Sequence, residues 1–558
     1  MNIVEQVTID LRQEVEQAIA QAQANGLFNY TQMPAFVIEV PKDKSHGDFA
    51  TNAAMLLTKE AKMKPRDIAQ AIVDNLNKDS KLIASVEIAG PGFINFFLKQ
   101  DWLYEILPIV EQQDTAFGSV NVGNGEKVQI EFVSANPTGL LHMGNARGGA
   151  LGDCLANLLK MAGYDVTKEF YINDAGNQIV NLGKSLEARY YQELGQTDYP
   201  FPEDGYHGED IRDTAKRIIA EVGDSYLALS PEERQEKMIA TALEEKVTNI
   251  RQGLLDFGIE YDVWFSETTL HESGAIQDVV QLLTDRGMTY EKDGAVWLKT
   301  TAFGEEKDEV LIRSNGIPTY FAADIAYHKN KFDRGFKRVI NIWGADHHGH
   351  VARMKGAMDA IGYNSEDLTV MLMQLVRLYR GGEVVRMSKR TGQYVTLQEL
   401  IEEVGKDAAR YFFIMRNPDS HLDFDLDLAK QQSSDNPVYY VQYAHARINS
   451  ILTATGEPVP TTAEANLALL TEEAELNLIR KIADLPQEIT YAAAELEPYR
   501  LARYATDLAT LFHSFYNSCR VLTDDAELKK ARLVLVNATR ITLRNVLTML
   551  GVSAPEKM

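Results

Sequence analysis

Two short segments of this chain carry residues suited to binding a nucleotide. The first, residues 135–145, reads ANPTGLLHMGN and follows an apolar run at 128–133. This layout predicts a strand, a turn and a helix N-terminus, whose unpaired N–H groups and positive dipole can hold phosphate. His142 stands at the start of that helix, beside Gly144 and Asn145, and can donate a hydrogen bond to a phosphate oxygen. These residues predict one half of an ATP site.

A basic loop far downstream supplies the second half. Residues 386–390 read RMSKR, with glycines on both sides of the loop. The chemistry that suits both halves is attack by a carboxylate on the α-phosphorus of ATP, in which the protein positions the reactants and neutralises charge. Lys389 is the candidate for the charge on the leaving phosphates, and Met387 and Ser388 lie beside it. Taken alone, the first segment is more often an ordinary turn and the second an ordinary exposed basic loop; the pair, in this order, favours the ATP site.

Other nucleotide and metal motifs receive less support. The chain has neither GxxxxGK[ST] nor GxGxxG, which disfavours P-loop, kinase and dinucleotide-binding chemistry. A histidine-rich loop at 346–350 follows an apolar strand pattern, but its spacing is not HExxH and no cysteine lies nearby, so we predict no metal site. We expect Asp346, His347 and His350 to contact the ribose or adenine of ATP. A histidine that caps the following helix is the competing interpretation.

Four residues are candidates for binding a cationic substrate. Glu131 lies inside an otherwise apolar strand near the phosphate turn, and a buried carboxylate needs a partner, which a cationic ligand could supply. Tyr320 and Asp324 are spaced i, i+4 and share one face of a helix. A carboxylate beside a phenol suits a guanidinium or ammonium group. Asn136 lies in the turn itself. For each residue alone, a local salt bridge or helix pair is the competing interpretation.

The pattern of strands and helices predicts a multidomain α/β protein. Strand, helix and strand patterns at 128–133, 151–162 and 166–172, resumed at 338–343, predict a Rossmann-type parallel sheet. We expect a catalytic domain at 119–429, interrupted by a helix-rich insertion at about 185–300. Residues 1–118 read as a separate α+β domain, and residues 430–558 as a helical bundle. Nucleotide sites in such sheets lie at the carboxyl edge, so His142 and Lys389 can converge there.

Composition limits the class of protein. The net charge of −24 argues against nonspecific nucleic-acid binding through global charge, although it permits a local basic face. Cys154 and Cys519 are far apart and form no disulfide framework. The N-terminal segment is a charged amphipathic helix pattern rather than a signal peptide, and no apolar run reaches membrane-spanning length. We therefore expect a cytoplasmic protein without a membrane partner.

Several motifs together resemble class I aminoacyl-tRNA synthetases, and within them the arginyl-tRNA synthetase family. HMGN resembles the HIGH signature, and RMSKR resembles the KMSKS loop. Further matches run along nearly the whole chain: VPKDKSHGDFATNAAM, EFVSANPTGLLHMGNARG, YINDAGNQ, TYFAADIAYH, IWGADHHGH, YVQYAHARI and LGVSAPEKM. Two departures stand out. Asn145 replaces the second histidine of HIGH, and Arg386 and Arg390 replace the first lysine and the last serine of KMSKS.

The resemblance implies an arginine–tRNA ligase that uses ATP with Mg²⁺. It implies an N-terminal domain at the tRNA elbow, a Rossmann catalytic domain and an anticodon-binding bundle, with tRNA(Arg), L-arginine and ATP as partners. We expect a monomer, in which tRNA is needed even for adenylate formation. Arginine would be held by a set of five residues: Glu131, Ser134, Asn136, Tyr320 and Asp324.

Aromatic and basic residues at the start of the bundle are candidates for tRNA contact. Tyr439, Tyr443 and Arg447 could supply stacking and a phosphate contact, although tyrosines at such spacing also pack between helices. Three other functions stay open: a class I synthetase for glutamate, glutamine, cysteine or lysine, a cofactor adenylyltransferase, and a noncatalytic tRNA-binding relative. Two carboxylates near the site favour a cationic amino acid over an acidic one.

Overall fold

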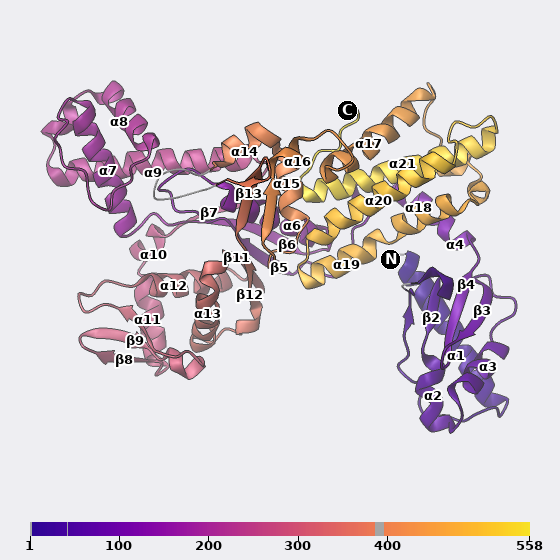
Figure 1. The fold of residues 1–558 in the computed structure, drawn as a ribbon. Helices are drawn as coiled ribbons and strands as arrows, with labels where there is room; N and C mark the ends of the chain where they lie inside the picture. Colours follow the sequence, from indigo (N-terminus) through magenta and orange to yellow (C-terminus); the bar gives the residue numbers. More distant parts are fainter. Residues whose placement is uncertain (1–2, 42, 386–394) are drawn as a thin grey trace.

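The computed structural model describes residues 3–41, 43–385 and 395–558. Its N-terminal part is a separate lobe in Figure 1, with an antiparallel sheet of order β1-β2-β4-β3 and its own apolar core. The helices bury one apolar face each against this sheet, as their periodicity predicts. The elements of the lobe are α1 (Ile3–Ala24), β1 (Ile38–Glu39), β2 (Phe49–Thr51), α2 (Ala53–Ala61), α3 (Pro65–Asp74), β3 (Ile83–Ala89) and β4 (Phe93–Leu98).

A five-stranded parallel sheet of order β12-β11-β5-β6-β7 forms the centre of the molecule. The strand order reverses between β5 and β11, and the crevice outside the carboxyl ends at such a point is where open α/β sheets bind ligands. This sheet, with the N-terminal lobe and the C-terminal helices, confirms the expected fold class. The strands are β5 (Lys127–Glu131), β6 (Asp165–Ile172), β7 (Val263–Ser266), β11 (Arg338–Gly344) and β12 (Leu368–Met373).

Different helices cover the two faces of this sheet. Helix α6 (Met143–Met161) lies against Phe132, just beyond β5, so closely that a Cβ on Gly152 would overlap the phenyl ring. Helix α12 (Tyr320–Asp333) bonds to Glu131, the residue before Phe132. Because alternate residues of an extended segment point to opposite faces, one short stretch supplies both an apolar and a polar layer.

The region expected as one helix-rich insertion is more complex. A helical arm comes first, at the upper left of Figure 1, and β7 then rejoins the central sheet. A small antiparallel sheet of order β10-β9-β8 follows. The elements are α7 (Asn177–Glu193), α8 (Glu209–Val222), α9 (Pro231–Asp256), α10 (Thr268–Glu272), α11 (Ala275–Asp285), β8 (Thr289–Lys292), β9 (Ala295–Leu298) and β10 (Glu309–Ile312).

The apolar run at 368–378, which its sequence pattern alone predicts as a single strand, is two strands in different sheets. Strand β12 pairs with β11, whereas β13 (Val376–Arg380) pairs with β14 (Glu383–Val384) and β15 (Leu422–Asp425). At the junction, Gln374 turns away and its N–H donates to the carbonyl of Pro418. The expectation of one strand was wrong because a continuous apolar pattern does not reveal a change of sheet.

The C-terminal region is a helical bundle. Helix α21 (Ala526–Leu550) is long and apolar enough by composition to cross a membrane, but 78% of its most apolar window is buried inside the protein. Its neighbours include α6, α17, α18 and α20, so its apolar residues form the bundle core. The other helices are α17 (Pro437–Ala454), α18 (Glu473–Ala483), α19 (Leu485–Glu495) and α20 (Tyr499–Ser518).

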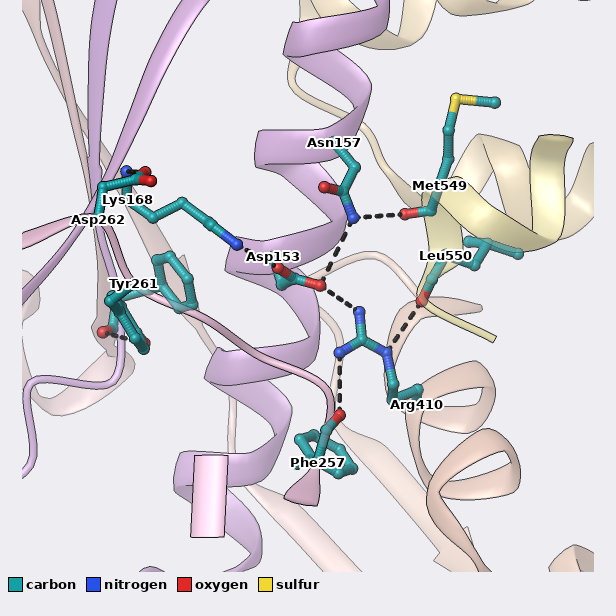
Figure 2. Close-up of polar contacts among 10 residues, drawn as sticks. Asp153, Asn157, Lys168, Phe257, Tyr261, Asp262, Arg410, Met549 and Leu550 are labelled. Atoms are coloured by element: carbon teal, nitrogen blue, oxygen red, sulfur yellow. Dashed lines mark hydrogen bonds and ion pairs between the residues drawn. The ribbon is translucent and has the colours of Figure 1, made fainter. Parts of the chain in front are cut away.

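A buried arginine joins the bundle to the central sheet (Figure 2). Arg410, on α15 (Lys406–Ile414), is fully buried and pairs with Asp153 of α6 at 2.6 Å. It also donates to the carbonyls of Leu550, the last residue of α21, and Phe257, at 3.0 and 3.2 Å. Lys168 contacts the other oxygen of Asp153 at 3.0 Å. Burial raises the pKa of this carboxyl, but the charges of Arg410 and Lys168 outweigh burial and lower it.

Candidate functional site

The turn at 135–145, which the sequence predicts to bind phosphate, leads into a capped helix N-terminus at the carboxyl edge of β5. His142 is the N-cap of α6: its Nδ1 accepts a hydrogen bond from the N–H of Gly144 at 3.1 Å. The Oδ1 of Asn145 accepts from the N–H of His142 at 3.0 Å. With Nδ1 as an acceptor, the proton of a neutral His142 lies on Nε2, which makes Nε2–H a donor. Asn145 therefore serves in the capping box, a role that its amide performs without charge.

The segment that follows the predicted second half of the ATP site pairs with this turn. The basic loop, with Arg386, Met387, Ser388, Lys389 and Arg390, lies outside the described residues. The segment that follows it forms a bridge with the turn: Thr396 pairs with His142. The N–H of Met143 donates to the carbonyl of Val395 at 3.3 Å. The segments that contain His142 and Thr396, about 250 residues apart in the sequence, thus meet at one edge of the sheet.

The backbone just after β5 is strained. Val133 and Ser134 have φ values of 69° and 38°, and the N–H of Ser134 donates to the carbonyl of Phe132 at 3.0 Å. A β-branched residue at positive φ is rare, and such strain persists only where surrounding contacts hold it. Here Oγ of Ser134 accepts from the N–H of Tyr171 at 3.1 Å. Asn136, two residues on, is exposed at the rim of the turn.

Two carboxylates from different elements form an acidic pair beside this strained turn. Asp324 lies on α12, and Glu267 follows β7 and is only 3% exposed. Burial raises the pKa of Glu267, hydrogen bonds from His271 and Tyr171 lower it, and the charge of Asp324 raises it. Burial and the charges of Glu267 and Asp324 also raise the pKa of Tyr171. The acidic pair and Tyr171 therefore occupy one neighbourhood.

Neither carboxylate of the acidic pair forms an ion pair with a lysine or arginine among the described residues. Within the described residues, the ion pairs of both carboxylates are to histidines: His350 lies 3.1 Å from Asp324, and His271 lies 3.4 Å from Glu267. Tyr320, on the same helix as Asp324, is 48% exposed. A planar guanidinium bonds carboxylates through paired N–H donors, which is the chemistry that this arrangement fits. Glu267 was absent from the sequence-based candidates because β7 was not recognised as a strand of the central sheet.

Glu131 already has a cationic partner inside the protein. Its Oε2 accepts from Nζ of Lys331 at 2.6 Å, and both side chains are buried. The cation that the sequence left open for this carboxylate is thus supplied, at least in part, by the chain itself.

The residues of the predicted nucleotide loop after β11 lie in two different environments. Asp346 and His347 are exposed, with 3.9 Å between Oδ1 of Asp346 and Nε2 of His347. His350 instead turns toward Asp324 and packs against Trp343, with ring centroids 5.5 Å apart. It therefore lies with the residues predicted to bind the substrate arginine.

Among the described residues, no group of three or more His, Cys, Asp or Glu side chains is placed to hold a metal ion.

The predicted tRNA-contacting residues lie together on α17. The rings of Tyr439 and Tyr443 stack with centroids 6.0 Å apart, and Arg447 donates to the hydroxyl of Tyr443 at 3.1 Å. The Arg447 guanidinium lies 4.4 Å from the ring centroid of Tyr516 on α20. Tyr443 is 37% exposed, so part of this surface is open to a stacking partner.

Comparisons with known proteins agree over the whole chain. Three family models match: the arginyl tRNA synthetase N terminal domain at 10–98, the class I (R) tRNA synthetase catalytic domain at 107–451, and the DALR anticodon binding domain at 441–558. Arginine–tRNA ligases of Moorella thermoacetica and Heliobacterium modesticaldum are 63% and 62% identical, each covering 100% of both chains. A Thermus thermophilus arginyl-tRNA synthetase structure has a TM-score of 0.72 at 25% identity, covering 98% of this chain and 100% of its own. The chain belongs to the arginyl-tRNA synthetase family.

Proposed function

We propose that this chain is an arginine–tRNA ligase. It joins L-arginine to the 3′ end of tRNA(Arg) in two steps, using ATP and releasing AMP and pyrophosphate. The observation that carries this specificity is the acidic pair, Asp324 and Glu267, at the carboxyl edge of the sheet beside the phosphate turn. A guanidinium on this pair places the amino-acid carboxylate toward the turn.

Each step balances without a covalent enzyme intermediate. The arginine carboxylate attacks the α-phosphorus of ATP, the bond to the β-phosphate oxygen breaks, and pyrophosphate leaves. The terminal ribose hydroxyl of tRNA then attacks the carbonyl carbon, and AMP leaves. The protein stabilises developing charge: Nε2–H of His142 and the N-terminus of α6 face phosphate, with Gly144 allowing close approach. Lys389 and its neighbours Met387 and Ser388 serve the leaving phosphates.

The remaining contacts follow from position in the site. Arginine is held by Asp324, Glu267 and Tyr320 at its guanidinium end and by Glu131, Ser134 and Asn136 near the turn. Asp346 and His347 line the nucleoside side, whereas His350 contacts Asp324 on the arginine side. Mg²⁺ would be held by the phosphates of ATP and by one or two carboxylates of the protein, and it would neutralise phosphate charge. The exposed Asp346, at the same sheet edge, fits that role.

The domain plan gives tRNA two further contacts. We assign residues 1–118 to the tRNA elbow, 119–429 to catalysis and 430–558 to the anticodon, with Tyr439, Tyr443 and Arg447 as a stacking surface. The protein acts as a monomer in the cytoplasm.

The test is ATP–pyrophosphate exchange with each amino acid, with and without tRNA. Exchange should occur with arginine and tRNA. Asp324→Ala and Glu267→Gln should each raise KM for arginine by roughly 100-fold, since each removes a charged partner of a buried cation. His142→Ala should instead lower kcat at nearly unchanged KM, because its bond strengthens in the transition state. Exchange absent with arginine under every tRNA condition would refute the assignment.

A further inference from the structure

A row of buried polar side chains crosses the central sheet beneath the proposed arginine site. Asn341 of β11, Glu131 of β5 and Glu169 of β6 are direct partners in register on adjacent strands. All three are buried, with exposures of 0%, 7% and 0%. Buried polar groups on a sheet face are costly unless each has a partner, so this row needs a layer of partners above it.

Helix α12 supplies that layer and joins the row to the site. Lys331 is fully buried and donates to Oε2 of Glu131 at 2.6 Å and to Oδ1 of Asn341 at 2.8 Å. One turn earlier, His328 contacts Nδ2 of Asn341 at 2.7 Å through Nε2 and the carbonyl of Asp324 at 2.8 Å through Nδ1. An unbroken series of bonds therefore runs from Glu131 to the backbone of Asp324.

Every donor in this series is determined by its neighbour. The carbonyl of Asp324 can only accept, so Nδ1 of His328 carries the proton. Nε2 of His328 must then accept from the amide nitrogen of Asn341, which leaves Oδ1 of Asn341 to accept from Lys331. Burial and the charge of Lys331 hold the pKa of His328 well below its usual range, so the ring stays neutral, as this pattern requires.

We propose that Lys331, Asn341 and His328 are positioning residues that set the separation of Glu131 and Asp324, and thereby the length of cationic amino acid that the site accepts. This inference rests on the proposed function, in which these two residues hold opposite ends of arginine. The series is continuous, so neither end moves without breaking one of its hydrogen bonds. Lys331 also neutralises Glu131, which leaves the acidic pair Asp324 and Glu267 as the attraction for the substrate's side-chain cation.

The same helix and the same row provide a matched control. Glu169, one strand further along, accepts from Arg334 at 2.7 and 2.9 Å and from the hydroxyl of Tyr327 at 2.8 Å. As in the Lys331 series, a basic side chain at the end of α12 donates to a buried carboxylate of the row. No bond joins Arg334 to Asp324 in the described structure, however. Removing Arg334 disturbs the layer without disturbing the proposed spacing.

The experiment measures length discrimination in tRNA-supported ATP–pyrophosphate exchange by the full-length protein. The substrates are arginine, homoarginine, which is one methylene longer, and 2-amino-4-guanidinobutyrate, which is one methylene shorter. One methylene is ordinarily discriminated by about 10–200-fold in kcat/KM. Lys331→Met should reduce the discrimination ratio about tenfold or more and raise KM for arginine, with KM for ATP within about twofold of wild type. Arg334→Met should leave the ratio unchanged.

A second pair of variants keeps the test decisive if Lys331→Met does not fold. His328→Gln offers both a donor and an acceptor in place of the ring and should retain most of the discrimination, whereas His328→Leu should lose it. The proposal is overturned if Lys331→Met and Arg334→Met change the ratio equally, or if His328→Gln and His328→Leu behave alike. A wild-type protein that does not activate arginine refutes the proposed function itself, which is a separate result read from the wild type alone.

Discussion

Replacing Arg410 by methionine tests how firmly the last helix of the bundle is held to α6. The substitution keeps an unbranched stem but removes the pair with Asp153 and two donors to helix-end carbonyls. Removing one partner of a buried pair costs about 3–5 kcal/mol. Since Lys168 still neutralises Asp153, we expect the lower value, about 3 kcal/mol, which corresponds to roughly a hundredfold in an equilibrium constant.

Hydrogen exchange locates this loss. In Arg410→Met, amides at the end of α21 should exchange about a hundredfold faster than in the wild type, while amides in the N-terminal lobe are unaffected. Arg377→Met is the control, because its pair with Asp423 is about half exposed and such pairs contribute about 0–1 kcal/mol. Wild-type protection at residues 545–552 in Arg410→Met would show that the apolar packing of α21 alone holds the helix, and the reasoning would be refuted.

Three further predictions concern α6. Gly152→Ala should destabilise the protein by about 1–3 kcal/mol in urea unfolding, despite the better helix propensity of alanine, because the new Cβ overlaps Phe132; a gain in stability would contradict this. Burial raises the pKa of Cys154 to about 12, so in a Cys519→Ala background the thiol should react with a disulfide reagent at pH 8 only after unfolding. The pKa of Asp153 is lowered in the folded protein, so its ionised form stabilises the protein above the unfolded value of about 3.8. This stabilisation is lost as the pH falls through the folded pKa, and the stability gap between wild type and Asp153→Asn should narrow below pH 4.

The sequence predicted the elements whose patterns are local. The strands at 166–172 and 338–343 and the helix that starts after His142 depend on periodicity and turn residues, and the structure has them as β6, β11 and α6. What it could not predict were relations between segments. The break at Gln374 depends on which strand each half pairs with, and the role of Glu267 depends on β7 returning to the central sheet after a helical arm of about 80 residues.

The partner of Glu131 illustrates the same limit. A carboxylate in an apolar strand indicates that the carboxylate needs a partner. The sequence does not show which of its 56 lysines and arginines is that partner. Lys331 is 200 residues away, and its position depends on α12 packing across β5 and β11. The local residue types thus indicated the site. Tertiary packing determines which of its charged groups are paired with other side chains of the protein.

The continuous series of hydrogen bonds from Glu131 to Asp324 also constrains how this protein can change over evolutionary time. The donor or acceptor role of each group is fixed by the group bonded to it. A substitution that replaces the donor of Asn341 by an acceptor, or the reverse, therefore requires changes at His328 and Lys331 as well. Single substitutions in the series pass through a protein with an unsatisfied buried group, whereas joint substitutions do not. Variants with a new amino-acid specificity should therefore carry compensating changes in α12 and β11 together, and the effects of those changes should be strongly epistatic.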